Sequence, residues 1–226
     1  MTWVKICGIT NLEDALVAVD AGADAVGFVF YEKSPRFVSV ETAREIIARL
    51  PQDVEKVGVF VGTEPEDVAA VSSQTGLSAA QVYLHSRPSP QMDAEFIRRS
   101  GCRMIPALSA GTLGQEELIG FAVPDGAREA IPAMLIDSGS SDRPGGTGKR
   151  LPSGLLAEFS ATAARIGLKF ILAGGLNAEN VSEAIRSVHP WGVDVASGVE
   201  ARPGKKDPEK VRAFVKAVRE YDAKVS

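Results

Sequence analysis

Residues 169–198 read KFILAGGLNAENVSEAIRSVHPWGVDVASG, and this stretch decides the fold. It begins with an apolar run, continues through an amphipathic segment that opens on Asn177, and ends with a second apolar run. Neither apolar run alternates with polar residues, which is typical of parallel strands buried on both faces. The stretch therefore predicts two parallel strands joined by a helix.

The same alternation runs through the rest of the chain. Apolar runs predict further strands at residues 3–8, 24–30, 56–61, 79–85, 103–109 and 133–138. Amphipathic segments predict helices at residues 11–22, 40–50, 64–76, 177–188 and 207–221, whereas residues 111–131 predict only a broken or short helix. Eight strands alternating with helices, without a linker, predict one α/β domain over residues 1–226, a single closed (β/α)8 TIM barrel.

Composition limits the partners that such a barrel can have. Of 226 residues, 45% are apolar and 24% are charged, and the net charge is -4, which argues against nucleic acid or an anionic membrane as the main partner. No apolar run approaches the roughly 20 residues that span a bilayer, and no signal peptide is evident. Cys7 and Cys102 are too few for a disulfide framework and lack metal-ligand spacing, so we expect a cytoplasmic protein without a metal.

Chemically capable residues stand where the predicted strands end. Active sites of such barrels form at the carboxyl ends of the strands. The residues at these ends are Cys7, His85, Asp137, Gly174, Gly175, Ser197 and Gly198.

Three glycine-rich turns predict a phosphate site. They are GGTGK at 145–149, AGGLN at 173–177 and ASGVE at 196–200, after the last three strands. Glycine lets backbone N–H groups approach an anion, and the loops after the last two strands of such barrels often bind phosphate. Tight turns alone would also explain single glycines, but three such turns favour a site that includes Gly146, Gly148, Gly174, Gly175, Ser197 and Gly198.

With these residues in view, the chain resembles the phosphoribosylanthranilate isomerases. The segments KICGIT, SPRFVS, LIDS, GGTGK, LAGGLN and SGVEARPGKKD occur in order along the chain. The resemblance implies an Amadori rearrangement of N-(5-phosphoribosyl)anthranilate in tryptophan biosynthesis, on a small phosphorylated substrate and without cofactor or metal. The chain departs from the family pattern at Tyr83 and Ser86, and at Leu151, Pro152 and Ser153, which leaves the packing around the aromatic half of the substrate open.

The resemblance also implies that Cys7 is the general base and Asp137 the general acid. Arg36 either binds the substrate carboxylate, which a guanidinium can do through two parallel hydrogen bonds, or is a solvated loop residue. A thiol with a pKa of ~8.5 is mostly protonated at neutral pH, so a nearby cation is needed. Lys5 lies two residues before Cys7 and hence on the same face of the strand. We expect Lys5 to stabilise the thiolate and Asp194, on the neighbouring last strand, to compensate the charge of Lys5.

The general acid needs a pKa above that of an ordinary carboxyl group, whereas the general base needs a pKa below that of an ordinary thiol. A carboxyl group with a pKa of ~3.9 rarely holds a proton at neutral pH. Partial burial and the negative charges of the substrate are expected to raise the pKa of Asp137.

Several assignments stay open at this level. His85 either contacts substrate or hydrogen-bonds within the strand end, and Lys149, Lys205 and Lys206 are expected on the solvated surface, although they could steer an anionic substrate. Competing functions are the related isomerisation of histidine biosynthesis, on a substrate with two phosphates, and a non-catalytic barrel that binds a phosphate ligand. Monomer and homodimer are both compatible with the sequence.

Overall fold

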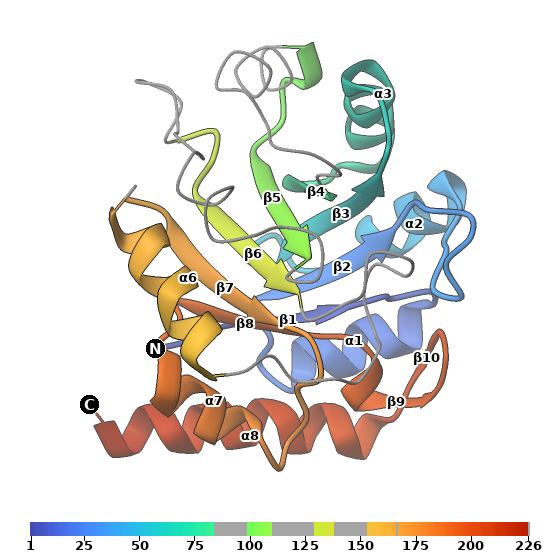
Figure 1. The fold of residues 1–226 in the computed structure, drawn as a ribbon. Coiled ribbons are helices and arrows are strands. Elements are labelled where there is room, and N and C mark those ends of the chain that lie inside the picture. Colours follow the sequence, from blue (N-terminus) through green and yellow to red (C-terminus); the bar gives the residue numbers. More distant parts are fainter. Residues whose placement is uncertain (84–98, 110–128, 138–152, 166, 226) are drawn as a thin grey trace.

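The strands predicted from the sequence close into one barrel (Figure 1). The computed structural model describes residues 1–83, 99–109, 129–137, 153–165 and 167–225. Parallel pairing joins each strand to the next and β8 back to β1, which confirms the predicted architecture. The strands are β1 (Trp3–Cys7), β2 (Ala25–Val29), β3 (Glu55–Val61), β4 (Ala79–Tyr83), β5 (Met104–Ser109), β6 (Ala133–Asp137), β7 (Lys169–Ala173) and β8 (Gly192–Val195).

Helices surround the barrel. Those described are α1 (Leu12–Asp20), α2 (Val40–Ile47), α3 (Pro65–Thr75), α6 (Ser153–Arg165), α7 (Val181–Val188) and α8 (Pro208–Val225). Most residues between β4 and β5 and between β5 and β6, including the greater part of residues 111–131, lie outside the described ranges.

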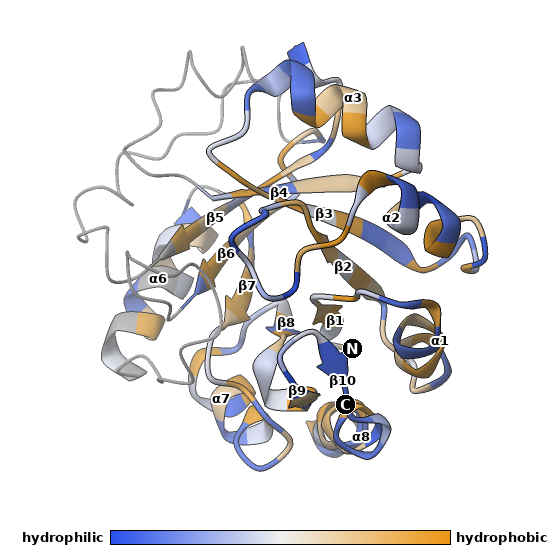
Figure 2. Ribbon diagram, turned by 90° about the vertical axis from the view of Figure 1, so that its right-hand side faces the viewer, coloured by the Kyte–Doolittle hydropathy of each residue, from blue (hydrophilic) through white to orange (hydrophobic). Residues whose placement is uncertain are grey.

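Apolar residues cover both faces of the strands, which explains the lack of polar alternation in the sequence. One cluster fills the space between strands and helices, where Val4, Ile6 and Phe28 pack with helix residues such as Phe214. A second cluster lies inside the barrel and consists of Ala25, Val57, Ala79, Ile105, Ala107, Ala133, Leu135, Ile171 and Ala173. Figure 2 shows mostly hydrophobic strands within helices of mixed hydropathy. Polar groups inside the barrel are therefore exceptions that need a reason.

The helix ends follow the local signals in the sequence. Asn11 caps α1, because its side-chain oxygen accepts a hydrogen bond from the backbone N–H of Asp14 at 2.9 Å. Pro65 is the first residue of α3, which ends before Gly76 as predicted. The Asn11 side chain pairs one of the backbone N–H groups that the start of a helix leaves without a partner, and Pro65 has no N–H group that would need one.

Loss of the cap should have a modest, measurable effect. We expect Asn11→Ala to lower the free energy of unfolding by about 1 kcal/mol, because the N–H of Asp14 loses its acceptor. Urea unfolding measures the change. Asn11→Ser keeps an acceptor and should cost only a few tenths of a kcal/mol. Equal stability of the alanine and serine variants would show that the cap contributes nothing.

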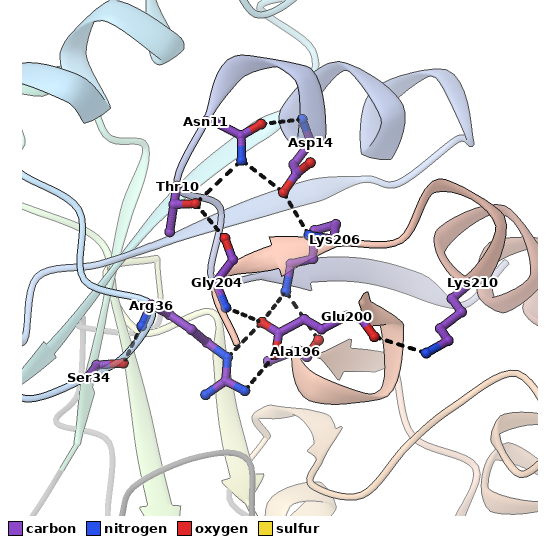
Figure 3. A network of polar contacts seen from close by, with 10 residues as sticks. All are labelled: Thr10, Asn11, Asp14, Ser34, Arg36, Ala196, Glu200, Gly204, Lys206 and Lys210. Carbon is purple, nitrogen blue, oxygen red and sulfur yellow. Dashed lines mark hydrogen bonds and ion pairs between the residues drawn. The ribbon is translucent and has the colours of Figure 1, made fainter. Parts of the chain in front are cut away.

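A short hairpin follows β8 and connects this late part of the chain to residues near the N-terminus. After the 3-10 turn η1 (Ser197–Val199), β9 (Glu200–Arg202) pairs antiparallel with β10 (Lys205–Lys206). The backbone N–H of Lys206 donates to Asp14 at 2.7 Å, and the Thr10 hydroxyl donates to the carbonyl of Gly204 at 2.6 Å (Figure 3). These contacts fix the hairpin against the start of α1, beside the end of β1.

Candidate active site

A cleft opens at the carboxyl ends of the strands, where the catalytic face was predicted. The space within it, including space open to solvent, is about 670 Å³. The sequence-predicted residues that line it are Cys7, Arg36, Asp137, Gly174, Gly175, Asp194, Ser197 and Gly198. The residues that lie outside the described ranges are His85, Ser86, Gly146, Gly148, Lys149, Leu151 and Pro152, and the side chain of Ser153 is also not described.

The end of β1 places Cys7 at the floor of this cleft. Its side chain points into the barrel with Val29 and Val59 and is only 7% exposed. Gly8 follows with φ +80°, a conformation that side chains with a Cβ rarely adopt. A Cβ at this position would also lie 2.6 Å from Cδ of Arg36. Glycine therefore lets the chain turn directly after Cys7 while Arg36 packs over the turn.

Lys5 occupies the barrel one layer below Cys7. It is 1% exposed, and its Nζ lies 2.9 Å from Oδ1 of Asp194 and 2.9 Å from Oε1 of Gln81. Although burial works against the charged form, the Asp194 carboxylate and the nearby Cys7 raise the pKa of Lys5 above its ordinary value. The expected ion pair between Lys5 and Asp194 is thus present, and Gln81 completes it from across the barrel.

Two opposing effects act on the pKa of Cys7. Burial raises the pKa of the Cys7 thiol, and this effect outweighs the stabilisation of the thiolate by Lys5 and Lys206. Lys5 does act in the expected direction, but it does not bring the pKa below the usual thiol range. Without substrate, Cys7 therefore carries its proton at neutral pH.

Asp137 ends β6 and points into the same cleft. It is 4% exposed, and its Oδ2 accepts a hydrogen bond from the hydroxyl of Tyr83 at 2.8 Å. Burial and the negative charge of Asp137 raise the pKa of Tyr83 well above its ordinary value, so the phenol keeps its proton. A carboxyl group and a phenol donor thus form one polar unit in the cleft.

Arg36 lines the cleft, but its guanidinium already binds a carboxylate of the protein. Its Nε and Nη2 donate to Oε1 and Oε2 of Glu200, both at 2.8 Å (Figure 3). Nη1 has no hydrogen-bond partner within the described ranges. The side chain is 12% exposed, so Arg36 is a fixed cation at the rim and not a solvated loop residue.

Lys206 corrects an expectation, since it is not on the solvated surface. It is 1% exposed, and its Nζ lies 3.1 Å from Oε1 of Glu200 and 3.1 Å from the carbonyl oxygen of Ala196. Burial lowers the pKa of Lys206, although Glu200 works against the shift. Lys205 is partly exposed and pairs with Glu13 at 2.8 Å and Asp14 at 2.6 Å. Glu200 thus forms ion pairs with two cations, Arg36 and Lys206, beside the cleft.

The glycine-rich turns after β7 and β8 meet at the cleft. Gly174 and Gly175 line it from the end of β7, and Ser197 and Gly198 line it from the end of β8. A Cβ at Gly198 would lie 1.8 Å from the carbonyl oxygen of Leu176, so the two turns touch. The predicted glycine residues of these two strands are thus brought to one place.

Similarity to known proteins identifies the family. The family model described as N-(5'phosphoribosyl)anthranilate (PRA) isomerase matches residues 4–217. The N-(5'-phosphoribosyl)anthranilate isomerase of Chlorobaculum parvum is 45% identical over 224 residues, which are 98% of this chain and 97% of that protein. The chain belongs to this family.

Solved structures of the family agree with the fold. The phosphoribosyl anthranilate isomerase of Thermotoga maritima has a TM-score of 0.79 and 41% identity, and the match covers 97% of this chain and 100% of that one. A crystal structure of a phosphoribosyl anthranilate isomerase in complex with reduced 1-(o-carboxyphenylamino)-1-deoxyribulose 5-phosphate has a TM-score of 0.75 and 38% identity. The match covers 97% of this chain and 100% of that one. A family member of this fold therefore binds a small phosphorylated molecule.

The structure adds site residues that sequence reasoning had treated as departures or surface. Tyr83 was only a deviation from the family pattern, and Lys206 was placed in solvent. Glu200 and Gln81 had no assigned role. Gln81 and Tyr83 are two residues apart on β4 and share its inner face, so strand periodicity alone could have placed both in the barrel. Nothing local to the hairpin sequence indicated that Glu200 and Lys206 are buried.

Neither a metal-ligand cluster nor a membrane-spanning helix is present in the described part of the chain. It contains no cluster of three or more His, Cys, Asp or Glu side chains that could hold a metal ion. It also contains no helix that is both long and apolar enough to cross a membrane.

The contact between the glycine turns predicts a binding defect. We expect Gly198→Ala to raise KM for the phosphorylated substrate at least about tenfold, because a new Cβ forces the turns after β7 and β8 apart and weakens contacts to an anion. Steady-state kinetics measures the change. Gly154→Ala is the matched control, because an added Cβ there would have no atom of the described residues within 4 Å. An unchanged KM in Gly198→Ala would exclude this wall of the cleft as part of the binding site.

Proposed function

We infer that Cys7 and Asp137 act as general base and general acid in the isomerisation of N-(5'-phosphoribosyl)anthranilate. As a member of its family, the protein catalyses this step of tryptophan biosynthesis, the Amadori rearrangement to 1-(2-carboxyphenylamino)-1-deoxyribulose 5-phosphate. The assignment of these roles is supported by the positions of both residues in the cleft.

The arrangement of strands around the cleft carries the proposal. Cys7 ends β1 and Asp137 ends β6, and on the shorter way around the barrel only β7 and β8 separate them. These two strands bear the glycine turns at residues 174–175 and 197–198. A substrate whose phosphate lies against these turns has its ribose between the thiol and the carboxyl group.

The first chemical step is a proton transfer from Asp137 to the furanose ring oxygen. The bond between C1 and this oxygen breaks, and the lone pair of the anthranilate nitrogen forms the C1=N bond of a protonated Schiff base. Asp137 is left as a carboxylate, and the ring oxygen becomes a hydroxyl group. A positioned acid of this kind typically contributes ~10²–10⁴ in rate.

In the second step Cys7 removes the proton from C2. The C2–H electron pair forms a C1=C2 double bond, the nitrogen is neutralised, and the enol that results tautomerises to the ketone of the product. One proton is delivered and one is removed, so the rearrangement balances without an oxidant, a reductant or a cofactor.

Charged groups around the site help Cys7 to lose a proton and help Asp137 to hold one. Lys5 and Lys206 lie close enough to Cys7 to lower its pKa against the effect of burial, and so they stabilise the thiolate as it forms. Asp137 accepts a hydrogen bond from the neutral phenol of Tyr83. The phosphate and carboxylate of the substrate add negative charge, which favours the protonated form of Asp137.

Arg36 is the proposed partner of the anthranilate carboxylate. Glu200 holds two of its nitrogens and leaves Nη1 for a further acceptor at the rim of the cleft. The carboxylate would then be bound by a guanidinium whose orientation is already set, which reduces the entropy lost on binding.

A direct assay tests the function. Freshly prepared N-(5'-phosphoribosyl)anthranilate should lose its fluorescence when the protein is added, whereas the histidine-pathway substrate should remain unchanged. Turnover of only the latter substrate, or tight binding of the product without any turnover, would overturn the proposal in favour of the corresponding alternative.

A further inference from the structure

Lys206 is a buried lysine whose side chain contacts two different parts of the candidate site. Its Nζ lies 3.1 Å from the carbonyl oxygen of Ala196 and 3.1 Å from Oε1 of Glu200 (Figure 3). Lys206 is not one of the described residues that line the cleft, whereas Ala196 is. Because a buried ion pair adds little stability compared with apolar residues of the same size, these contacts indicate a role other than stability.

The contact with Ala196 orients the start of the turn after β8. The backbone of Ala196, with φ −122° and ψ −79°, is neither helical nor extended, so regular secondary structure does not determine how the next peptide group is oriented. This peptide bond is trans, and in a trans peptide the C=O and N–H groups point in opposite directions. Since Lys206 holds the carbonyl of Ala196, the N–H of Ser197 points away from Lys206, at a residue that lines the cleft. This orientation suits an N–H group that donates to the phosphate of the substrate.

The contact with Glu200 orients Arg36. Oε1 of Glu200 accepts hydrogen bonds from Nζ of Lys206 and from Nε of Arg36, and Oε2 accepts one from Nη2 of Arg36. Lys206 thus holds the carboxylate in an orientation in which it receives two parallel hydrogen bonds from the guanidinium. Lys206 therefore acts on the turn after β8 directly and on Arg36 through Glu200.

The hairpin of β9 and β10 holds the backbone of Lys206 in place. Its N–H donates to Oδ2 of Asp14 at 2.7 Å, and Asp14 is 1% exposed at the start of α1. Oδ1 of Asp14 pairs with the neighbouring Lys205 at 2.6 Å. Lys206 is thus fixed at both ends, by its backbone on α1 and by its ammonium group on Ala196 and Glu200.

We propose that Lys206 is a positioning residue for both anionic groups of the substrate, the phosphate through the turn at Ala196 and the carboxylate through Glu200 and Arg36. This inference rests on the function proposed above. The phosphate and the carboxylate lie at opposite ends of the substrate, so a single group that fixes both contacts also fixes the spacing between them. Contacts that are already in place before binding reduce the entropy lost when the substrate is bound.

Lys206→Met tests both contacts, with inorganic phosphate and benzoate as competitive inhibitors that each replace one anionic group of the substrate. We expect both inhibition constants to rise about tenfold, the equivalent of one lost hydrogen bond to a charged group. Inhibition constants are the suitable readout, because Lys206 also stabilises the Cys7 thiolate and its loss therefore affects kcat as well. Glu200 keeps its ion pair with Arg36 in this variant, and thermal melting verifies the fold.

Glu200→Gln separates positioning from simple electrostatic attraction, and it tests the inference even where Lys206→Met does not fold. The change removes one negative charge, so attraction alone predicts stronger inhibition by both ions. Positioning predicts that benzoate inhibits at least about threefold more weakly, because an amide cannot accept two parallel hydrogen bonds from Arg36. Phosphate should inhibit no more weakly than in the wild type. Stronger inhibition by both ions would overturn the inference.

Lys205→Met is the matched control, because it removes the neighbouring ammonium group of the same hairpin. Lys205 pairs with Glu13 and Asp14 and not with Ala196 or Glu200, so both inhibition constants should stay within about twofold of the wild type. Unchanged constants in Lys206→Met, or an equal rise in Lys205→Met, would overturn the inference alone. Absence of turnover by the wild type would instead overturn the proposed function.

Discussion

Replacing Cys7 with serine should lower kcat at least about a hundredfold while the fold is retained. A hydroxyl group occupies nearly the same space as a thiol, but it ionises at a far higher pH and so cannot accept the C2 proton at a useful rate. Cys7 is 7% exposed and packs with Val29 and Val59, so the small change in volume should be tolerated. Kinetics with the natural substrate and a melting curve provide the two measurements.

The pH dependence gives a more specific test of Cys7. A base acts in its deprotonated form, and burial raises the pKa of Cys7 above the ordinary value of a thiol. Because Asp137 must hold its proton while Cys7 has lost one, kcat/KM should follow a bell-shaped profile whose alkaline limb lies above the ordinary thiol pKa of about 8.5. This alkaline limb should be absent in Cys7→Ser.

Cys102→Ser is the matched control for this experiment. Cys102 precedes β5, and its thiol donates to the carbonyl of Ser100 at 3.2 Å, away from the cleft. The control should have wild-type kcat and the same pH profile as the wild type. If Cys7→Ser also turned over at a near-normal rate, another group would have to be the base.

Asp137→Asn should cause a loss of similar size, at least about a hundredfold in kcat. An amide keeps the shape of the carboxyl group and can still accept the hydrogen bond from Tyr83, but it has no proton to give to the ring oxygen. Because binding is preserved, KM should change little. The reaction is followed by the same assay of substrate fluorescence.

The control for Asp137 is a conservative change elsewhere. Asp20 is exposed at the end of α1, so Asp20→Asn should leave kcat and KM unaffected. The profile of kcat should lose the ionisation that depends on Asp137 only in Asp137→Asn. Near-normal turnover by this variant would contradict the assignment of the general acid.

Much of the barrel could be predicted because the signals that define it are local. The continuous apolar runs mark strands buried on both faces, and Asn11, Pro65 and Gly76 mark helix ends that the structure has in the same places. One rule, that the carboxyl ends of parallel strands share a face, was enough to expect Cys7, Asp137 and the glycine turns near one another. The spacing of Lys5 and Cys7 likewise placed both on the inner face of β1.

The sequence by itself thus determined the barrel and the end of its strands at which the cleft opens, with the residues proposed for catalysis. Only the tertiary structure decided how these groups are tuned. The contacts of Tyr83 with Asp137 and of Arg36 with Glu200 join residues that are 54 and 164 positions apart. Burial of Lys206 and the raised pKa of Cys7 depend on how completely the packed chain excludes water. The desolvation of a group and its contacts across the barrel depend on many segments that are distant in sequence, so no local sequence pattern predicts them.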